Sequence, residues 1–104
     1  MTEYSIIITT TNKDEIARNI ATELVKRQLA RCVQIDKTSS IYEWNGNIEQ
    51  EEEYRLSIKA ANHNIDKIKE LIIELHNYEL PEIVTLAITG GSEKYLQWLN
   101  GELV

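Results

Sequence analysis

An Asn-Gly pair between two long strand-like segments constrains this chain more than any other feature of its sequence. Asn45 and Gly46 follow a run that ends in Trp44 and precede a second run of similar character. A two-residue type I′ turn needs positive φ at both central residues, and Asn-Gly adopts it at low cost. We therefore expect a β-hairpin over residues 33–60, with Trp44 opposite Asn47.

This register divides the hairpin side chains between two faces, because side chains alternate along a strand with period two. The apolar face, which we expect to join the core, carries Val33, Ile35, Ile41, Ile48, Tyr54, Leu56 and Ile58. The opposite face is mostly polar and includes Glu49, Glu51 and Glu53, which favours a solvated strand face over a site for a hard cation. It also carries Tyr42 and Trp44, which suggests that something covers it.

The remaining segments predict two further strands and three helices. The β-branched run over residues 4–11, with three consecutive isoleucines, is typical of a central strand buried on both faces. Apolar residues at helical spacing predict one helix from about Asn12 to Leu29 and another that is capped by Asn62 or Asn64 and ends before Pro81. A short third helix starts at Ser92. Residues 83–89 predict a short strand.

The predicted element order is β-α-β-β-α-β-α, and it indicates an α+β chain. Two βα units joined by a hairpin form the split βαβ or ferredoxin-like sandwich, here with a long hairpin and a short C-terminal helix. Right-handed crossovers place both long helices on one face of a four-stranded antiparallel sheet. The 104 residues fit a single domain, 1–104. The uncovered sheet face is then available to another chain.

Three details of these segments are open to test. The first hairpin strand is expected to break near Asp36-Lys37, and Asn12 and Glu15 stand at the spacing of a capping box for the first helix. Ser92 is expected to cap the C-terminal helix.

Composition excludes several classes of protein. A net charge of −6 argues against a nucleic-acid binder, and no run reaches the ~20 apolar residues of a membrane span. The N-terminal residues lack the features of a signal peptide, so we expect a cytoplasmic protein. One cysteine rules out an intrachain disulfide, and two histidines cannot build a multi-histidine zinc site within one chain.

Few side chains are candidates for chemistry. His76, at the end of a predicted helix, could be a metal ligand or acid/base group, or could simply complement the helix dipole. Cys32 could be a thiolate ligand or a nucleophile, but at the start of a core strand it is more typical of a small buried hydrophobe. Lys59, on the face of Tyr42 and Trp44, could bind an anion or pair with Glu82 across an interface, or be an exposed strand-end lysine.

Aromatic side chains give the strongest collective signal. They are Tyr42, Trp44, Tyr78, Tyr95 and Trp98. Aromatic residues are enriched at the centres of protein interfaces, so self-association is favoured over a sugar- or base-stacking surface.

Several segments, in order and spacing, resemble one known family. They are Leu29-Ala30-Arg31-Cys32, Ser40-Ile41-Tyr42-Glu43-Trp44-Asn45-Gly46, Ile58-Lys59, His76-Asn77-Tyr78-Glu79-Leu80-Pro81-Glu82-Ile83 and Tyr95-Leu96-Gln97-Trp98-Leu99. The chain resembles the CutA family of divalent-cation tolerance proteins over nearly its whole length. The resemblance implies a ferredoxin-like fold assembled as a tight homotrimer, similar to the signal-transduction protein PII. Tyr42, Trp44 and Trp98 are then expected at the trimer interface.

The resemblance also implies a link to copper and other divalent cations, with no established enzymatic reaction. The ligands proposed for copper in bacterial members correspond here to Thr9, Leu75 and His76, so His76 alone remains of the three. We therefore expect no required cofactor, with copper or another divalent cation as an optional ligand. The usual proline after the histidine is Asn77 here.

These observations together predict a homotrimeric binding or regulatory module. A pocket between subunits is expected to contain Tyr42, Trp44, Lys59, His76, Tyr78 and Glu82, and to suit a small anion or a weakly held metal. The alternatives are a ligand-free structural trimer or adaptor and, less favoured, a small enzyme that uses Cys32 or His76.

Overall fold

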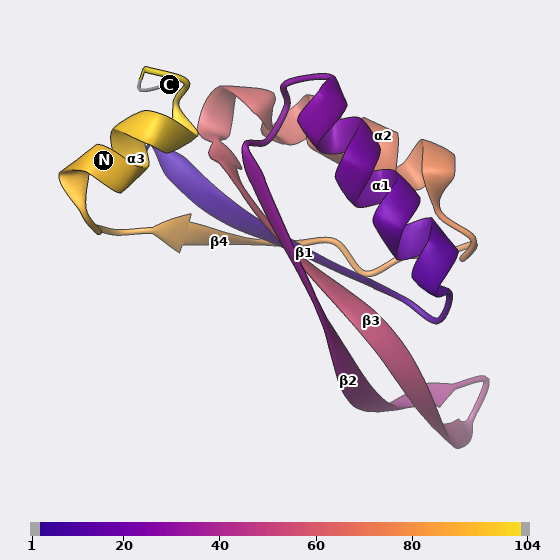
Figure 1. Cartoon of the computed structure of the whole chain (residues 1–104). Helices are drawn as coiled ribbons and strands as arrows, with labels where there is room; N and C mark the ends of the chain where they lie inside the picture. The colour runs from indigo at the N-terminus through magenta and orange to yellow at the C-terminus, as the bar shows by residue number, and fades with distance from the viewer. Residues whose placement is uncertain (1–2, 103–104) are drawn as a thin grey trace.

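The computed structural model describes residues 3–102 as an α+β fold, an antiparallel sheet with two long helices on one face (Figure 1). The elements are β1 (Tyr4–Thr11), α1 (Asp14–Lys26), β2 (Cys32–Trp44), β3 (Asn47–Ala61), a 3₁₀ turn (Asn62–Asn64), α2 (Ile65–Leu75), β4 (Val84–Ile88) and α3 (Glu93–Leu99). The predicted element order is confirmed. The short α3 lies apart from the other two helices.

The sheet has the strand order β2-β3-β1-β4, with every neighbouring pair antiparallel. The predicted hairpin register is confirmed, since Trp44 lies opposite Asn47. The φ angles of Asn45 and Gly46 are 51° and 80°, which is why this dipeptide stands at the turn. β2 and β4 are the edge strands of the sheet.

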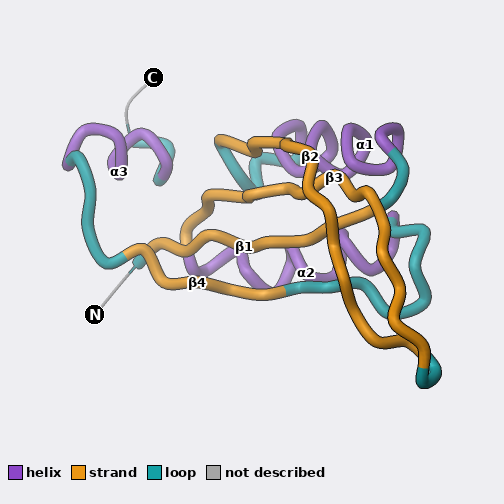
Figure 2. Tube along the Cα trace, turned by 90° about the horizontal axis from the view of Figure 1, so that it is seen from below, coloured by secondary structure: helices purple, strands orange, loops and turns teal. Residues whose placement is uncertain are grey.

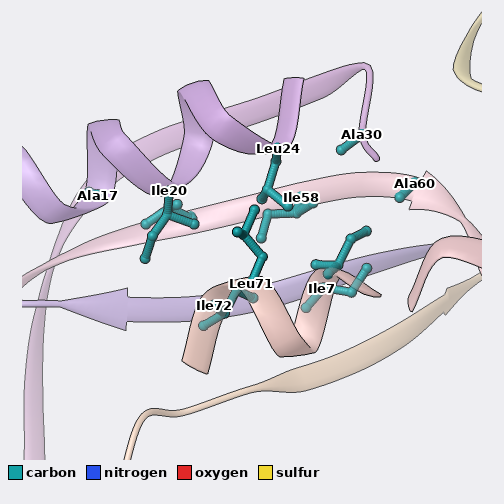
Figure 3. Close-up of a cluster of buried hydrophobic side chains, with 11 residues drawn as sticks. Ile7, Ala17, Ile20, Leu24, Ala30, Ile58, Ala60, Leu71 and Ile72 are labelled. Atoms are coloured by element: carbon teal, nitrogen blue, oxygen red, sulfur yellow. The ribbon is translucent and has the colours of Figure 1, made fainter. Parts of the chain in front are cut away.

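The core lies between the sheet and the two long helices (Figure 3). Its fully buried side chains come from β1, β3, α1 and α2 and include Ile7, Leu56, Ile58, Ala17, Ile20, Leu24, Ile68 and Ile72. Burying one such aliphatic side chain contributes roughly 1.5–3 kcal/mol. This core holds the central strand β1 in place.

Neither long helix covers the opposite side of the sheet, and α3 reaches only its end, where Tyr95 contacts Lys59. Strand pairing places Ile6 opposite Leu86 and Ile8 opposite Val84, and these side chains alternate with the buried Ile7. We call this side the helix-free face and define its aliphatic part as Ile6, Ile8, Val84, Leu86 and Ile88. Ile6 and Ile8 are half-buried, so the prediction that β1 is buried on both faces is wrong within the chain. The two long helices cover one face only.

The far half of the β2–β3 hairpin extends beyond the body of the fold (Figures 1 and 2). The β1–β3 pairing ends where Thr11 meets Tyr54, whereas β2 and β3 continue to the turn. Ile41 and Ile48 are therefore 70% and 82% exposed, and the prediction that they join the core is wrong. Their face was assigned correctly, but no helix reaches that far.

β2 runs without interruption, so the predicted break near Asp36-Lys37 is also wrong. Asp36 lies opposite Arg55 on β3, and the Arg55 guanidinium donates to both carboxylate oxygens at 3.2 and 2.6 Å. These hydrogen bonds lower the pKa of Asp36 below its usual value. Asp36, one of the two polar residues that suggested a break, instead forms a cross-strand ion pair with Arg55.

The helix ends follow local hydrogen bonding. Lys13, not Asn12, occupies the N-cap position of α1, and no side chain caps it, so the predicted capping box is absent. α1 ends at Lys26, before the predicted Leu29, because Gln28 adopts a φ of 59° that a right-handed helix cannot continue. The predicted cap of α3 is confirmed, since the Ser92 hydroxyl accepts the Tyr95 N–H.

Candidate functional site

A cavity of about 560 Å³ lies between the far half of the hairpin and the segment that follows α2. Its lining residues are Thr10, Ser40, Ile41, Tyr42, Trp44, Glu51, Glu53, Tyr78, Glu79, Leu80 and Glu82. The hairpin contributes its polar face, which continues the helix-free face of the sheet. The lining contains three aromatic rings and four carboxylates, and no lysine or arginine. We call it the hairpin cavity.

Tyr78 connects the two walls of the hairpin cavity. Its hydroxyl donates a hydrogen bond of 2.7 Å to Glu53, although these residues lie on segments far apart in the sequence. Burial, and then the Glu53 carboxylate, raise the pKa of Tyr78 well above its usual value. The hydroxyl therefore stays protonated and donates to an anionic partner, which is a stronger bond than one between neutral groups.

Glu53 is buried, with an exposed fraction of only 6%. It belongs to the acidic run that sequence reasoning assigned to a solvated strand face. For Glu53 that interpretation is wrong, because the 78–82 segment folds over it. Glu51 is half-buried, and its carboxylate accepts the Tyr42 hydroxyl at 2.9 Å.

His76 supports Tyr78 from behind and does not line the hairpin cavity. Its Nδ1 accepts the Tyr78 backbone N–H at 2.9 Å, and its Nε2 lies 2.8 Å from the Thr10 carbonyl oxygen. Since Nδ1 is the acceptor, Nε2 must carry the proton that Thr10 accepts. Burial lowers the pKa of His76 and favours this neutral form. His76 thus fastens the segment after α2 to β1.

The three positions that the resemblance matches to proposed copper ligands do not fit a metal. Leu75 offers no donor, and both ring nitrogens of His76 are already hydrogen-bonded. The Thr9 hydroxyl is buried with no hydrogen-bond partner. In the part of the chain that the structure describes, no three His, Cys, Asp or Glu side chains gather in a metal-binding group. A metal at His76 would have to displace one of its hydrogen bonds.

The remaining candidates lie elsewhere. The Lys59 ammonium is 3.5 Å from the Tyr95 hydroxyl, so Lys59 lies beside α3 and does not line the hairpin cavity. Trp98, also on α3, has the Arg31 guanidinium 4.8 Å from its ring centroid. Cys32 is half-buried and pairs with Lys59 at that same end of the sheet.

Of the six predicted pocket residues, the hairpin cavity therefore brings together Tyr42, Trp44, Tyr78 and Glu82. Sequence reasoning did not include Glu51, Glu53, Glu79 and Leu80. A signal for the first two was present, because alternation places them on the strand face of Tyr42 and Trp44. Glu79 and Leu80 line the cavity because the 78–82 segment passes beside the hairpin, and the sequence pattern does not predict that path.

The fold and cavity define a class: a ferredoxin-like α+β domain with an extended hairpin whose polar face forms a cavity wall. The chain belongs to the CutA family, since residues 5–102 match the family model described as CutA1 divalent ion tolerance protein. The resemblance to this family that the sequence motifs indicated is confirmed.

Similar proteins occur in distant organisms. The divalent-cation tolerance protein CutA of Thermus thermophilus is 41% identical over 91% of this chain and 93% of its own length. The chloroplastic protein CutA of Arabidopsis thaliana is 36% identical over 91% of this chain, which spans only 53% of that protein. The crystal structure of CutA1 from the psychrotrophic bacterium Shewanella sp. SIB1 superposes with a TM-score of 0.93 at 41% identity, covering 97% of this chain and 95% of the other.

Proposed function

We propose that this chain assembles as a homotrimer and acts as a non-enzymatic binding or regulatory module in divalent-cation tolerance. The observation that carries the proposal is the helix-free face, whose aliphatic side chains are half-buried or exposed because neither long helix covers them. The names of the relatives support the tolerance role, and the exposed aliphatic surface of the chain supports the assembly.

The helix-free face has the character of a surface buried by another copy. Leu86 is 48% exposed, Val84 45%, and both lie beside Ile6 and Ile8 on the same sheet. Contiguous apolar patches of this kind on small proteins mark interaction sites. β2 and β4 are also edge strands, and backbone groups on such edges pair readily with another chain. When two different surfaces of one chain meet head to tail, repetition can close a ring such as a trimer.

A binding role is supported over catalysis by the positions of the two candidate reactive groups. Neither Cys32 nor His76 lines the hairpin cavity, and both nitrogens of His76 serve the fold. A nucleophile needs a base within hydrogen-bond reach. The cavity lining instead consists of aromatic rings, carboxylates, small polar groups and aliphatic side chains.

The proposal requires no resident metal. Copper as an optional ligand, and a cytoplasmic location, remain predictions from the sequence. Calorimetric titration of the assembly with Cu²⁺, repeated with His76→Ala, tests the first. Unchanged binding in that variant removes His76 as a ligand. In the part of the chain that the structure describes, no helix is both long enough and apolar enough to cross a bilayer.

The assembly is tested by a charge placed on each side of the molecule. Leu86→Asp puts a carboxylate in the middle of the helix-free face, and we expect the trimer to dissociate because burying an unpaired charge costs several kcal/mol. Ile73→Asp is the matched control, since Ile73 is 62% exposed on α2, away from the helix-free face. Sedimentation velocity should show smaller particles for Leu86→Asp only. Identical sedimentation of both variants would contradict the proposal.

A further inference from the structure

We propose that the hairpin cavity binds a small organic cation, an alkylguanidinium or alkylammonium group. This deepens the proposed binding function by naming the class of ligand, and it rests on that function. It differs from the small anion or metal that the sequence predicted for a pocket between subunits, because Lys59 and His76 do not line the hairpin cavity of the single chain, whereas four carboxylates do.

The first argument is charge. Glu51, Glu53, Glu79 and Glu82 all line the cavity, and no lysine or arginine does. The nearby Arg55 is already held by Asp36 at 2.6 Å, and this hydrogen bond, with a smaller effect of Glu82, raises the pKa of Arg55. An anion placed here would meet uncompensated negative charge, whereas a cation would be attracted.

The second argument is a buried acceptor that faces the cavity. Glu53 is more than nine-tenths buried, and its Oε2 accepts the Tyr78 hydroxyl. Its Oε1 takes no hydrogen bond from any residue that the structure describes. Because Oε1 is not among the buried atoms without a partner, it is accessible, and a ligand that supplies an N–H donor would form a charge-assisted hydrogen bond with it.

The third argument comes from the aromatic rings elsewhere in this chain. The rings of Tyr54, Tyr95 and Trp98 each have a cation of the chain 4.8–5.7 Å from the ring centroid: Lys37, Lys59 and Arg31, respectively. Among the described residues, the cavity rings of Tyr42, Trp44 and Tyr78 have no such partner. A cation over an aromatic face gains about 0.5–2 kcal/mol, most when water is excluded.

The combination of rings and carboxylates favours an organic cation over a metal ion. Divalent hard cations take six or more oxygen ligands and gain nothing from aromatic walls. A guanidinium or ammonium group on an alkyl chain uses both, with its N–H donors on the carboxylates and its flat or apolar part on the rings. The volume of about 560 Å³ lies within the range of small-molecule sites.

The test is calorimetric titration of the full-length assembly with n-butylguanidinium, with n-butylurea as a neutral probe of nearly the same shape. We expect saturable binding of butylguanidinium, with butylurea at least about tenfold weaker, because the charge-assisted bonds are lost. Equal affinity for the two probes, or no saturable heat with butylguanidinium, would overturn the proposal.

Two variants locate the binding. Glu82→Gln and Trp44→Leu should each weaken butylguanidinium about threefold to tenfold, as expected for one charged or one aromatic contact. Glu70→Gln removes an exposed glutamate of α2, far from the cavity lining, and should leave the affinity unchanged. Equal affinities in Glu82→Gln, Trp44→Leu and the unmodified chain would place the ligand elsewhere and refute the assignment.

Light scattering on the same samples separates the two proposals. A trimer that does not bind butylguanidinium would refute the cation site and leave the proposed assembly intact. The same result is expected if a second copy of the chain fills the cavity in the trimer, and it would likewise refute the cation site.

Discussion

The two faces of the sheet are built from the same strands, yet their side chains differ in burial. On the helix-covered face Ile7 is fully buried beneath α1 and α2, while its neighbours Ile6 and Ile8 point the other way and are half-buried. Alternation alone makes both faces apolar along β1. The difference is that the chain supplies a helix layer for one face and none for the other.

This difference in burial indicates that the two faces of the sheet have different roles. The helix-covered face supplies the stability of the single chain. The helix-free face carries an aliphatic part over β1 and β4, and its continuation along the hairpin forms an acidic and aromatic cavity. We infer that the first part serves assembly and the second serves binding.

The largest effect is expected on the helix-covered face. Ile7→Ala removes buried methyl groups and leaves a cavity, so the free energy of unfolding should fall by about 2–5 kcal/mol. Ile73→Ala, on the exposed side of α2, should change it by less than about 0.5 kcal/mol. Urea denaturation at one protein concentration measures both. Similar losses in the two variants would break the distinction between core and surface.

The next largest effect is expected from loss of the hydrogen bond between Tyr78 and Glu53 in the hairpin cavity. Tyr78→Phe leaves the buried Glu53 carboxylate without its donor, and should lower the free energy of unfolding by about 1.5–3 kcal/mol. Tyr42→Phe removes a similar bond to Glu51, but an exposed one, so its cost should stay below about 0.5 kcal/mol. Thermal and urea unfolding of the pair give the comparison. An equal cost would mean that burial of Glu53 adds nothing.

A smaller effect, of opposite sign, is expected for Thr9. Its hydroxyl is buried on the helix-covered face without a partner, so Thr9→Val should raise the free energy of unfolding by about 1 kcal/mol. Thr11→Val should lower it, since the Thr11 hydroxyl donates to Asn77 at 2.6 Å. If both substitutions lower stability, the Thr9 hydroxyl has a partner.

The smallest expected effect is a dependence on pH that comes from His76. Burial holds its folded-state pKa below the unfolded value of about 6.5. The unfolded chain therefore binds the proton more readily, and the stabilisation is present above pH ~6.5 and is lost as the pH falls toward the folded-state pKa. Unfolding free energies between pH 7.5 and 5.5, compared with those of His76→Gln, should show a steeper decline for the unmodified chain. Parallel curves would exclude His76 as the cause.

Much of this structure could be predicted from local sequence. Asn45-Gly46 set the turn and hence the pairing of the hairpin, and apolar spacing located the helices. The exposure of Ile41 could not be predicted, because it depends on where β1 and the helix layer end. The burial of Glu53 depends on the 78–82 segment, whose path follows from packing between distant parts of the chain. Local patterns do not encode such contacts.

The central claim is that other copies of this chain cover the aliphatic part of the helix-free face. Light scattering on the purified full-length protein tests it most directly. The account predicts a mass three times the 12.0 kDa of the chain, unchanged on dilution through the micromolar range. A mass equal to that of one chain would contradict it, because the aliphatic side chains of β1 and β4 would then face water.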